Sequence, residues 1–312
     1  MAVYTLVTQS QLNDFLEKYN LGELINYSGI IDGIANSHYA LITTQGAFIL
    51  TLFESLNSEE LPKIINLLRY LSDENSLYPQ LCVDKSGSVL NNLNNKATII
   101  CRRLIGEAMT NPSIYHCQQL GVQLAKLHLK TSHYQLNIES HNNLERLKTL
   151  FAKVTPFLTN EDHELIADEL AFQNQYADKY LPSGVIHGDL FRDNVLFNGD
   201  RLSGIIDFYS ACDDYLLRDI AIAINDWCVE AEGVNQDKVL ALLSAYQHIR
   251  PLQAIEKQQG LIFLRVTALR FWLSRLVHYY YSQEAQLSHP KDPLVFKKLL
   301  LAHRYTHFDY FH

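Results

Sequence analysis

The sequence predicts an α+β protein in which a small antiparallel sheet comes first and a mainly helical region follows. Short β-prone runs separated by turns continue to about residue 104. From about residue 113, apolar residues recur every three or four positions, as in helices that bury one face. A hairpin signal near residue 199 interrupts this helical region.

The size and charge of the chain restrict its class. Its 312 residues leave room for two domains, and 47% hydrophobic with 19% charged residues is ordinary for a soluble globular protein. The net charge of −8 argues against a general nucleic-acid or anionic-membrane surface. No apolar run approaches the ~18 residues of a membrane span. The first residues also lack the basic and apolar segments of a secretory signal.

The cysteines indicate a reducing environment. There are five, an odd number, and none forms a Cys-x-x-Cys pair. We therefore expect neither a disulfide framework nor a zinc site, and we expect a cytoplasmic protein.

The N-terminal part begins with a predicted helix over residues 10–24, capped by Ser10. Three β-prone runs then predict an antiparallel meander: Tyr27–Ile31, Ser37–Thr43 and Ala47–Phe53. The loop before the second strand holds Gly33, and the backbone amides of such a loop can hold phosphates. One glycine is weak support, because most loops between strands contain one. A helix over 58–71 and strands over 81–90 and 97–104 complete this part.

The later part is predicted to be helical. The expected helices cover residues 113–130, 142–158, 160–181, 220–227 and 260–281. His128 is expected to be a packed core residue. The arginines of the last helix, Arg265, Arg270 and Arg275, lie among apolar residues and read as paired core residues more than as a carboxylate clamp. His303, His307 and His312 are interpreted as a solvated aromatic tail without a metal.

The stretch from Val185 to Asp207 carries the chemistry. Two short strands, Val195–Phe197 and Leu202–Ile206, flank an Asn-Gly pair, which is a strong hairpin signal. Asp189 and Asn194 precede the hairpin and Asp207 follows it. Phosphoryl transfer needs such a set, because a carboxylate orients the attacking hydroxyl while an amide and a second carboxylate hold magnesium. The alternative is a polar turn whose acids are only solvated.

The spacing of Asp189 and Asn194 matches that of the catalytic Asp and metal-holding Asn in kinases of the protein-kinase type. The stretch resembles the aminoglycoside phosphotransferase-like kinases, which share the bilobal protein-kinase-like fold. The resemblance implies an N-lobe over residues 1–104, a C-lobe over 105–312, and ATP with Mg²⁺ as cofactors. It implies Asp189 as catalytic base and Asn194 and Asp207 as metal-holding residues.

The same resemblance implies further site residues. The residues expected to contact the nucleotide are Gly33, Asn36 and Ser37 of the loop before the second strand. Cys101, Arg103 and Leu104, at the hinge between the lobes, are expected to contact it as well. Asp219 is expected to brace the catalytic loop, together with His187.

The chain departs from the family at one position. Most members carry a phosphate-binding lysine on the third strand, where this chain has Thr51, and its glutamate partner is also missing from the helix over 58–71. The paired loss is reasonable, since an unpaired buried charge is costly. Our hypothesis is that loop amides and another cation, Lys63 or Arg192, replace the lysine.

The acceptor is indicated by resemblance over nearly the whole length. Gly188 and Tyr209 replace residues that regulated protein kinases have beside the two catalytic aspartates. The chain instead resembles the homoserine kinases of the family. The matching segments are Met1–Thr5, Gly46–Glu54, Gly184–Phe197, Asp200–Cys212, Ala268–Leu276 and Lys291–Pro293. The implied reaction transfers the γ-phosphate of ATP to L-homoserine. Arg270 and Arg275 are candidates for its carboxylate, and Asp226 or Asp189 for its ammonium group.

Other acceptors stay open from the residues alone. A choline kinase would use an aromatic cage, for which Trp227, Tyr209 and Trp272 are available. An aminoglycoside kinase would use an acidic pocket, for which Asp226, Glu230 and Glu232 are available. A methylthioribose kinase and a nucleotide-binding scaffold without turnover also remain, the latter favoured by Thr51. In each case the expected partner is a small molecule, not nucleic acid or a membrane.

Overall fold

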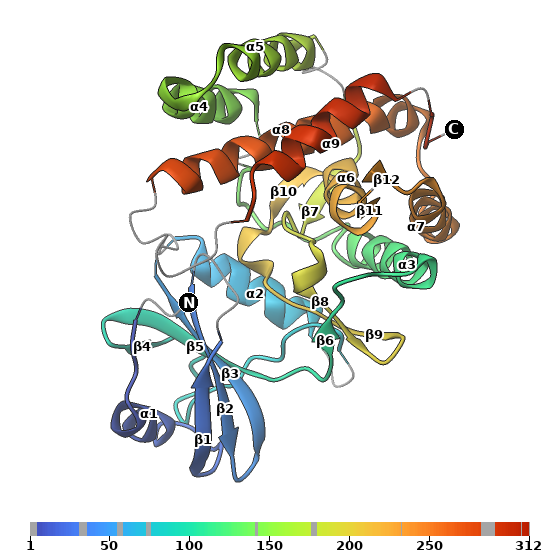
Figure 1. Ribbon diagram of the computed structural model, residues 1–312. Coiled ribbons are helices and arrows are strands. Elements are labelled where there is room, and N and C mark those ends of the chain that lie inside the picture. The colour runs from blue at the N-terminus through green and yellow to red at the C-terminus, as the bar shows by residue number, and fades with distance from the viewer. Residues whose placement is uncertain are drawn as a thin grey trace. The chain divides into compact units, whose positions relative to one another are not determined.

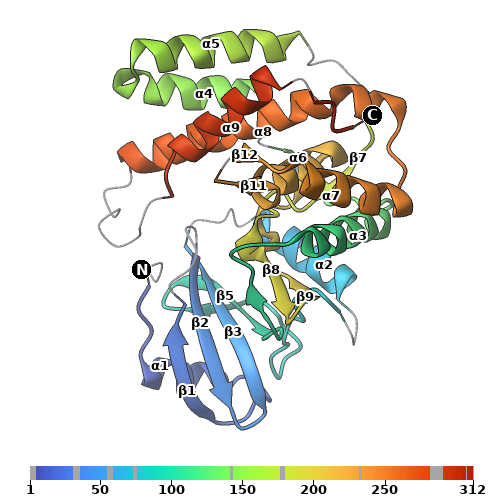
Figure 2. The same cartoon turned by 45° about the vertical axis from the view of Figure 1, so that its right-hand side comes forward.

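The computed structural model describes residues 5–30, 36–54, 59–72, 76–140, 143–175, 180–231, 233–281, 291–306 and 308–311. Gly33, His307, His312 and Glu232, which the sequence analysis singled out, lie outside these ranges. The described residues form two compact units (Figures 1 and 2). The first contains residues 5–106 together with Ser203–Tyr209, and the second contains the rest.

The first unit is built on an antiparallel sheet in the order β1-β2-β3-β5-β4. Its strands are β1 (Leu24–Gly29), β2 (Asn36–Thr43), β3 (Gly46–Phe53), β4 (Asn91–Leu93) and β5 (Lys96–Arg102). The predicted meander is therefore present. The predicted strand over 81–90 is wrong, because the hairpin partner of β5 is β4. Asn94 and Asn95 join these strands with positive φ angles of 52° and 62°, a conformation that asparagine tolerates.

The two faces of this sheet pack against different apolar clusters. Phe48, Leu50 and Leu52 alternate along β3 and join one core with α1 (Gln9–Leu16). Phe53 and Ile99 join a second core with α2 (Leu61–Leu71). Figure 1 shows α1 beside β1.

The first helix differs from its prediction at both ends. Thr8, not Ser10, is the N-cap, since it forms a reciprocal capping box with Gln11. The helix ends at Leu16 rather than near residue 24, and Leu24 begins β1. The apolar spacing continues past Leu16 because Tyr19 and Leu21 also enter the core.

The second unit is mainly helical, with short strands and 3₁₀ turns around the predicted catalytic stretch. Its helices are α3 (Ile114–Lys130), α4 (Leu144–Val154), α5 (Asn160–Asn174), α6 (Leu216–Trp227), α7 (Gln236–Ile249), α8 (Ala254–Tyr281) and α9 (Leu294–Tyr305). The strands are β6 (Glu107–Ala108), β7 (Ser183–Ile186), β8 (Val195–Asn198), β9 (Arg201–Ile205, shared between units), β10 (Cys212–Tyr215), β11 (Val229–Glu230) and β12 (Gly233–Val234). The 3₁₀ turns are η1 (Thr155–Phe157), η2 (Arg192–Asn194) and η3 (Phe208–Ser210).

One large apolar core joins α4, α5, α8 and α9 around Trp272, and Figure 1 shows these helices stacked in layers. The predicted helix over 160–181 stops at Asn174, and its N-cap is Thr159. The predicted helix over 142–158 ends at Val154 and continues as η1. None of the helices within the described ranges is long and apolar enough to cross a membrane.

His303 corrects the interpretation of the tail as solvated. It lies on α9 with only 1% of its surface exposed, and its Nε2 is 2.8 Å from Oδ1 of Asn225. It is a buried core residue with a polar partner, and burial lowers its pKa to about 3.

Candidate active site

The loop between β7 and η2 begins with a turn that only glycine fits. Gly188 has φ +77°, and a Cβ atom there would lie 2.4 Å from the carbonyl oxygen of Ser210. A side chain would therefore meet rigid backbone as well as an unfavourable backbone conformation. This explains why glycine, not the arginine of regulated protein kinases, precedes Asp189.

Asp219, in the first turn of α6, holds this loop by its backbone. Its Oδ2 accepts the N–H of His187 at 2.6 Å, and its Oδ1 accepts the N–H of Gly188 at 2.8 Å. His128 Nε2 lies 3.3 Å from the same Oδ2, and its Nδ1 lies 2.8 Å from the hydroxyl of Tyr246. Burial opposes the charge of Asp219, but the bond from His128 and the neighbouring donors outweigh it and lower the pKa.

Asp189 and Asn194 are joined across the η2 turn. Asn194 Nδ2 donates to the main-chain oxygen of Asp189 at 2.7 Å and lies 3.3 Å from its Oδ2. The N–H of Asp189 donates to Nδ1 of the buried His187 at 3.3 Å. Because the amide nitrogen of Asn194 is used inside the loop, its Oδ1 is the end left to accept a metal. An amide oxygen is one of the ligand types that magnesium takes.

Arg270 sets the electrostatics of Asp189. This α8 residue donates from Nη1 to the carbonyl oxygen of Gly188 at 3.3 Å. Burial raises the pKa of Asp189 above its usual range, while Arg270 and His187 partly offset the increase. The raised pKa makes the carboxylate of Asp189 a stronger base than that of a solvated aspartate, which suits proton acceptance from a hydroxyl.

Two predicted site residues are paired with each other. Asp226 Oδ2 accepts the backbone N–H of Arg192 at 2.7 Å and its Nε at 3.2 Å. Arg192 Nη1 also donates to the carbonyl oxygen of Thr110 at 2.8 Å. Arg192 was predicted to bind nucleotide and Asp226 to bind substrate. In this structure the pair also holds the η2 turn beside Asn194.

Two further cations of the second unit have oxygen partners, and the first of them lies against the catalytic loop. Lys291 Nζ is 2.5 Å from Oδ2 of Asp193 and 5.6 Å from the ring centre of Phe191. Arg275 donates to the carbonyl oxygen of Asp292 at 3.0 Å. Sequence reasoning had not named Lys291 as a site residue, although it belongs to the matching segment Lys291–Pro293. Because Lys291 is far in the sequence from the catalytic loop, nothing else in the sequence indicated that the two lie together.

In the first unit, Asp207 stands in a strained conformation just after β9. Its φ is +64°, which is uncommon for a residue with a side chain. The next residues anchor it, because Phe208 packs against Tyr78 at 5.7 Å and Tyr209 against Phe53 at 4.9 Å between ring centres. Strain that the surrounding packing maintains is common at functional positions.

Neutral side chains surround the position where the family lysine is expected. Thr51 is 1% exposed, and its Oγ1 lies 3.0 Å from Nδ1 of His38 on β2. Burial lowers the pKa of His38 to about 4, so this imidazole is uncharged at neutral pH. Burial also raises the pKa of the Tyr209 phenol, which hydrogen-bonds Thr51. This cluster holds no charge to replace the lysine.

The predicted nucleotide residues of the first unit have mixed surroundings. Ser37 is fully buried and its hydroxyl donates to Oε1 of Glu54 at 2.6 Å, while Asn36 Oδ1 accepts the N–H of Glu54 at 3.4 Å. Both side chains therefore stabilise the end of the β2–β3 pair where Asn36 faces Phe53. Cys101 is buried in β5, Arg103 is exposed and Leu104 is half-buried just after it. Lys63 is half-buried on α2.

The phosphotransferase enzyme family matches residues 26–253, and the chain belongs to this family. Several relatives that match over nearly the full length are homoserine kinases. That of Methylobacillus flagellatus is 41% identical over 96% of this chain and 94% of its own length. Those of Janthinobacterium and Neisseria meningitidis are 38% and 37% identical over 96% and 97% of this chain, and over 95% and 99% of their own. The predicted resemblance to the homoserine kinases is thus confirmed.

Solved structures of the same fold are more distant in sequence. An amicoumacin kinase superposes with a TM-score of 0.74 at 15% identity, covering 97% of this chain and 96% of its own. A spectinomycin phosphotransferase gives 0.69 at 14% identity, covering 96% and 99%. The predicted fold class, with an antiparallel sheet first and a mainly helical part second, is confirmed.

Proposed function

We propose that this protein is an ATP-dependent homoserine kinase, which transfers the γ-phosphate to the hydroxyl of L-homoserine and forms O-phospho-L-homoserine. The single observation that carries the proposal is full-length identity of about 40% to homoserine kinases, in a chain whose catalytic loop is intact. Asp189 orients the acceptor hydroxyl and takes its proton as the phosphate is transferred. Its raised pKa suits this role.

The cofactors of the proposal are ATP and Mg²⁺. When bound, magnesium supplies charge neutralisation at the phosphates. Asn194 offers Oδ1 to it, and Asp207 offers a carboxylate held by strained backbone. Among the described residues no three His, Cys, Asp or Glu side chains form a metal cluster. Magnesium in phosphoryl-transfer enzymes usually needs only one or two protein carboxylates besides phosphate oxygens and water.

Residues of the second unit are available for the amino-acid part of the acceptor. Arg270 lies next to Asp189 and is our first candidate for the carboxylate, with Arg275 as the second. Asp226 is a weaker candidate for the ammonium group, since Arg192 already neutralises it. Arg192 is for the same reason a weaker candidate for phosphate.

The remaining candidate for the missing lysine is Lys63. Our proposal predicts that Lys63→Ala weakens binding of Mg-ATP about tenfold, equal to about 1.4 kcal/mol. Calorimetry measures this directly, with the exposed Lys85→Ala of the same unit as the control. Unchanged affinity for ATP would remove Lys63 from the proposal.

The alternative acceptors are less well supported. Trp227 and Trp272 are 0% and 1% exposed, so they cannot line an open cage for choline. Glu230 is paired with Lys238 at 2.6 Å, which reduces the acidic pocket that a polycation would need. The missing lysine still favours a scaffold, but the intact Asp189 and Asn194 do not.

The test is a coupled assay of ADP release with homoserine, choline, methylthioribose and kanamycin as acceptors. We expect turnover with homoserine at a kcat/KM at least 100-fold above that with any other acceptor. Preference for another alcohol would refute the proposed acceptor. Stabilisation by Mg-ATP without ADP release on any of them would favour the scaffold. Cytoplasmic location remains a prediction of the sequence.

A further inference from the structure

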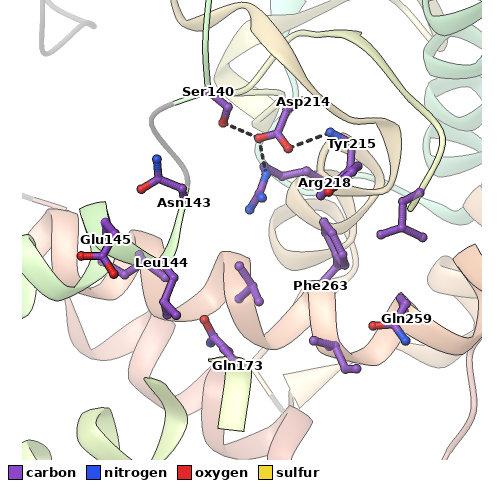
Figure 3. A pocket seen from close by; sticks show the side chains of 14 residues that line it. Ser140, Asn143, Leu144, Glu145, Gln173, Asp214, Tyr215, Arg218, Gln259 and Phe263 are labelled. Carbon is purple, nitrogen blue, oxygen red and sulfur yellow. Dashed lines mark hydrogen bonds and ion pairs between the residues drawn. The ribbon is translucent and has the colours of Figure 1, made fainter. Parts of the chain in front are cut away.

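A cavity of about 440 Å³ lies within the second unit, bounded by α4, α5, α8 and the junction of β10 with α6 (Figure 3). Its wall includes none of the residues proposed above for catalysis, metal or homoserine. Its size is in the range of small-molecule sites. Apolar side chains form most of the wall, among them Leu147, Leu181, Ile262, Phe263 and Val266.

Arg218 brings an unsatisfied donor to this cavity. Its side chain is only 8% exposed, and its Nε is 2.5 Å from Oδ2 of Asp214. Ser140 donates to the same carboxylate, which also accepts the N–H of Tyr215 at 2.7 Å. Nη1 of Arg218 is buried and has no hydrogen-bond partner among the described residues. A buried donor without an acceptor is energetically costly, so the site favours a ligand that supplies an oxygen.

Two other groups at the cavity favour the same kind of ligand. The N-terminus of α4 lies at its edge, where Asn143 accepts the N–H of Arg146 at 2.9 Å. A helix N-terminus carries partial positive charge and favours an anion, whereas Glu145 in the first turn of α4 also lines the cavity and opposes one. Gln259, which is 5% exposed, adds a polar side chain to the wall of the cavity. Figure 3 shows Arg218, Phe263 and the α4 residues Leu144 and Glu145 lining the same pocket.

We propose that this cavity is a second small-molecule site, which binds an organic carboxylate with a short aliphatic body. The carboxylate accepts from the guanidinium of Arg218, and the aliphatic part contacts Leu147, Ile262 and Phe263. The amide of Gln259 is available to a further polar group of the ligand. This site goes beyond the proposed kinase activity and does not depend on it.

The site is linked to the catalytic loop through α8. Phe263 and Val266 of this helix line the cavity, and Arg270 follows one turn later beside Asp189. Burial lowers the pKa of the Arg270 guanidinium, Asp189 opposes the decrease, and Arg218 adds to it by charge repulsion. An anion on Arg218 would weaken that repulsion. A ligand bound in the cavity would therefore change the electrostatic environment of Asp189 through Arg270.

The test measures binding of isovalerate, a short branched carboxylate, by calorimetry and thermal shift on the full chain. We expect saturable binding of isovalerate and at least tenfold weaker binding of isovaleramide, its neutral counterpart. L-valine as a third probe distinguishes a plain carboxylate from an amino acid. Arg218→Gln should lose binding at least tenfold. Arg265→Lys, which alters a buried ion pair outside the cavity (2.6 Å to Glu169), should bind normally.

Three outcomes would overturn the proposal. Wild type that binds neither isovalerate nor L-valine has no such site. Equal binding by Arg218→Gln would place any site elsewhere. Competition between isovalerate and homoserine, with a raised KM in Arg218→Gln, would make the cavity part of the acceptor site. If Arg218→Gln does not fold, Ile262→Phe fills the cavity instead, and normal binding by that variant would equally refute the proposal.

Discussion

Replacing Asp219 by asparagine tests how the catalytic loop is held. The carboxylate accepts from His187 N–H, Gly188 N–H and His128 Nε2, all in a fully buried site. The side-chain oxygen of asparagine can accept the hydrogen bonds that one oxygen of the carboxylate accepts now. Its NH₂ group then faces the N–H that the other carboxylate oxygen accepted. Losing one buried acceptor costs about 1–3 kcal/mol, and losing the charge weakens the other bonds by about 1 kcal/mol. We expect a total loss of about 3 kcal/mol in the free energy of unfolding.

Urea unfolding followed by circular dichroism measures this loss. Asp213→Asn is the matched control, since Asp213 Oδ2 accepts one backbone N–H, from Ile138 at 3.2 Å, and an amide oxygen can replace it. We expect the control to lose under about 1 kcal/mol. Equal losses in the two variants would refute the reasoning. Because the loop backbone leads directly into Asp189, Asp219→Asn should also lower kcat about 100-fold.

The dependence of stability on pH, at acid pH, gives a second test of the role of Asp219. The pKa of Asp219 is lowered in the folded protein, so its contribution to stability is present above the unfolded pKa of about 3.9. That contribution is lost as pH falls below this value toward the folded pKa. The difference between wild type and Asp219→Asn should therefore shrink between pH 5 and pH 3. A constant difference would contradict the assigned cause.

The remaining predictions concern the loop glycine and the base. Gly188→Ala places a Cβ atom 2.4 Å from the oxygen of Ser210 at φ +77° and should cost about 3 kcal/mol or more. Gly199→Ala, at φ +59° with nothing within 4 Å, should cost only about 1 kcal/mol, and equal costs in urea unfolding would contradict the steric account. Arg270→Gln removes a charge that lowers the pKa of Asp189, so the acid limb of the kcat/KM profile should move to higher pH. An unmoved limb would show that Arg270 does not act on the base.

The features that sequence predicted best are local in the chain. The Asn-Gly turn fixes the β8–β9 hairpin, and the Asp189 to Asn194 spacing corresponds to one η2 turn that Asn194 closes by hydrogen bonds to Asp189. The apolar periodicity over residues 113–130 predicted a helix with one buried face, and in α3 the buried residues include Leu120, Leu124 and Leu127. These signals need no knowledge of distant partners.

What sequence missed depends on contacts between distant residues. Nothing in the chain shows that Arg192 and Asp226, which are 34 residues apart, neutralise each other. Charge type alone therefore gave no sign of this pairing. The neutral partner of Thr51 was likewise hidden, since His38 faces it only after the β2–β3 register is set. The cap at Thr8 was missed because the choice between neighbouring Thr8 and Ser10 depends on where the chain enters the helix.

The most direct test of the central claim compares wild type with Asp189→Asn, using ³¹P NMR of the product formed from ATP and L-homoserine. Wild type should give a phosphomonoester on the homoserine hydroxyl. Asp189→Asn should lower its rate at least 1,000-fold, more than the usual loss for a general base because orientation is lost too, while Mg-ATP affinity stays within about threefold. Phosphohomoserine formed at the wild-type rate by Asp189→Asn, or none formed by wild type, would contradict the account.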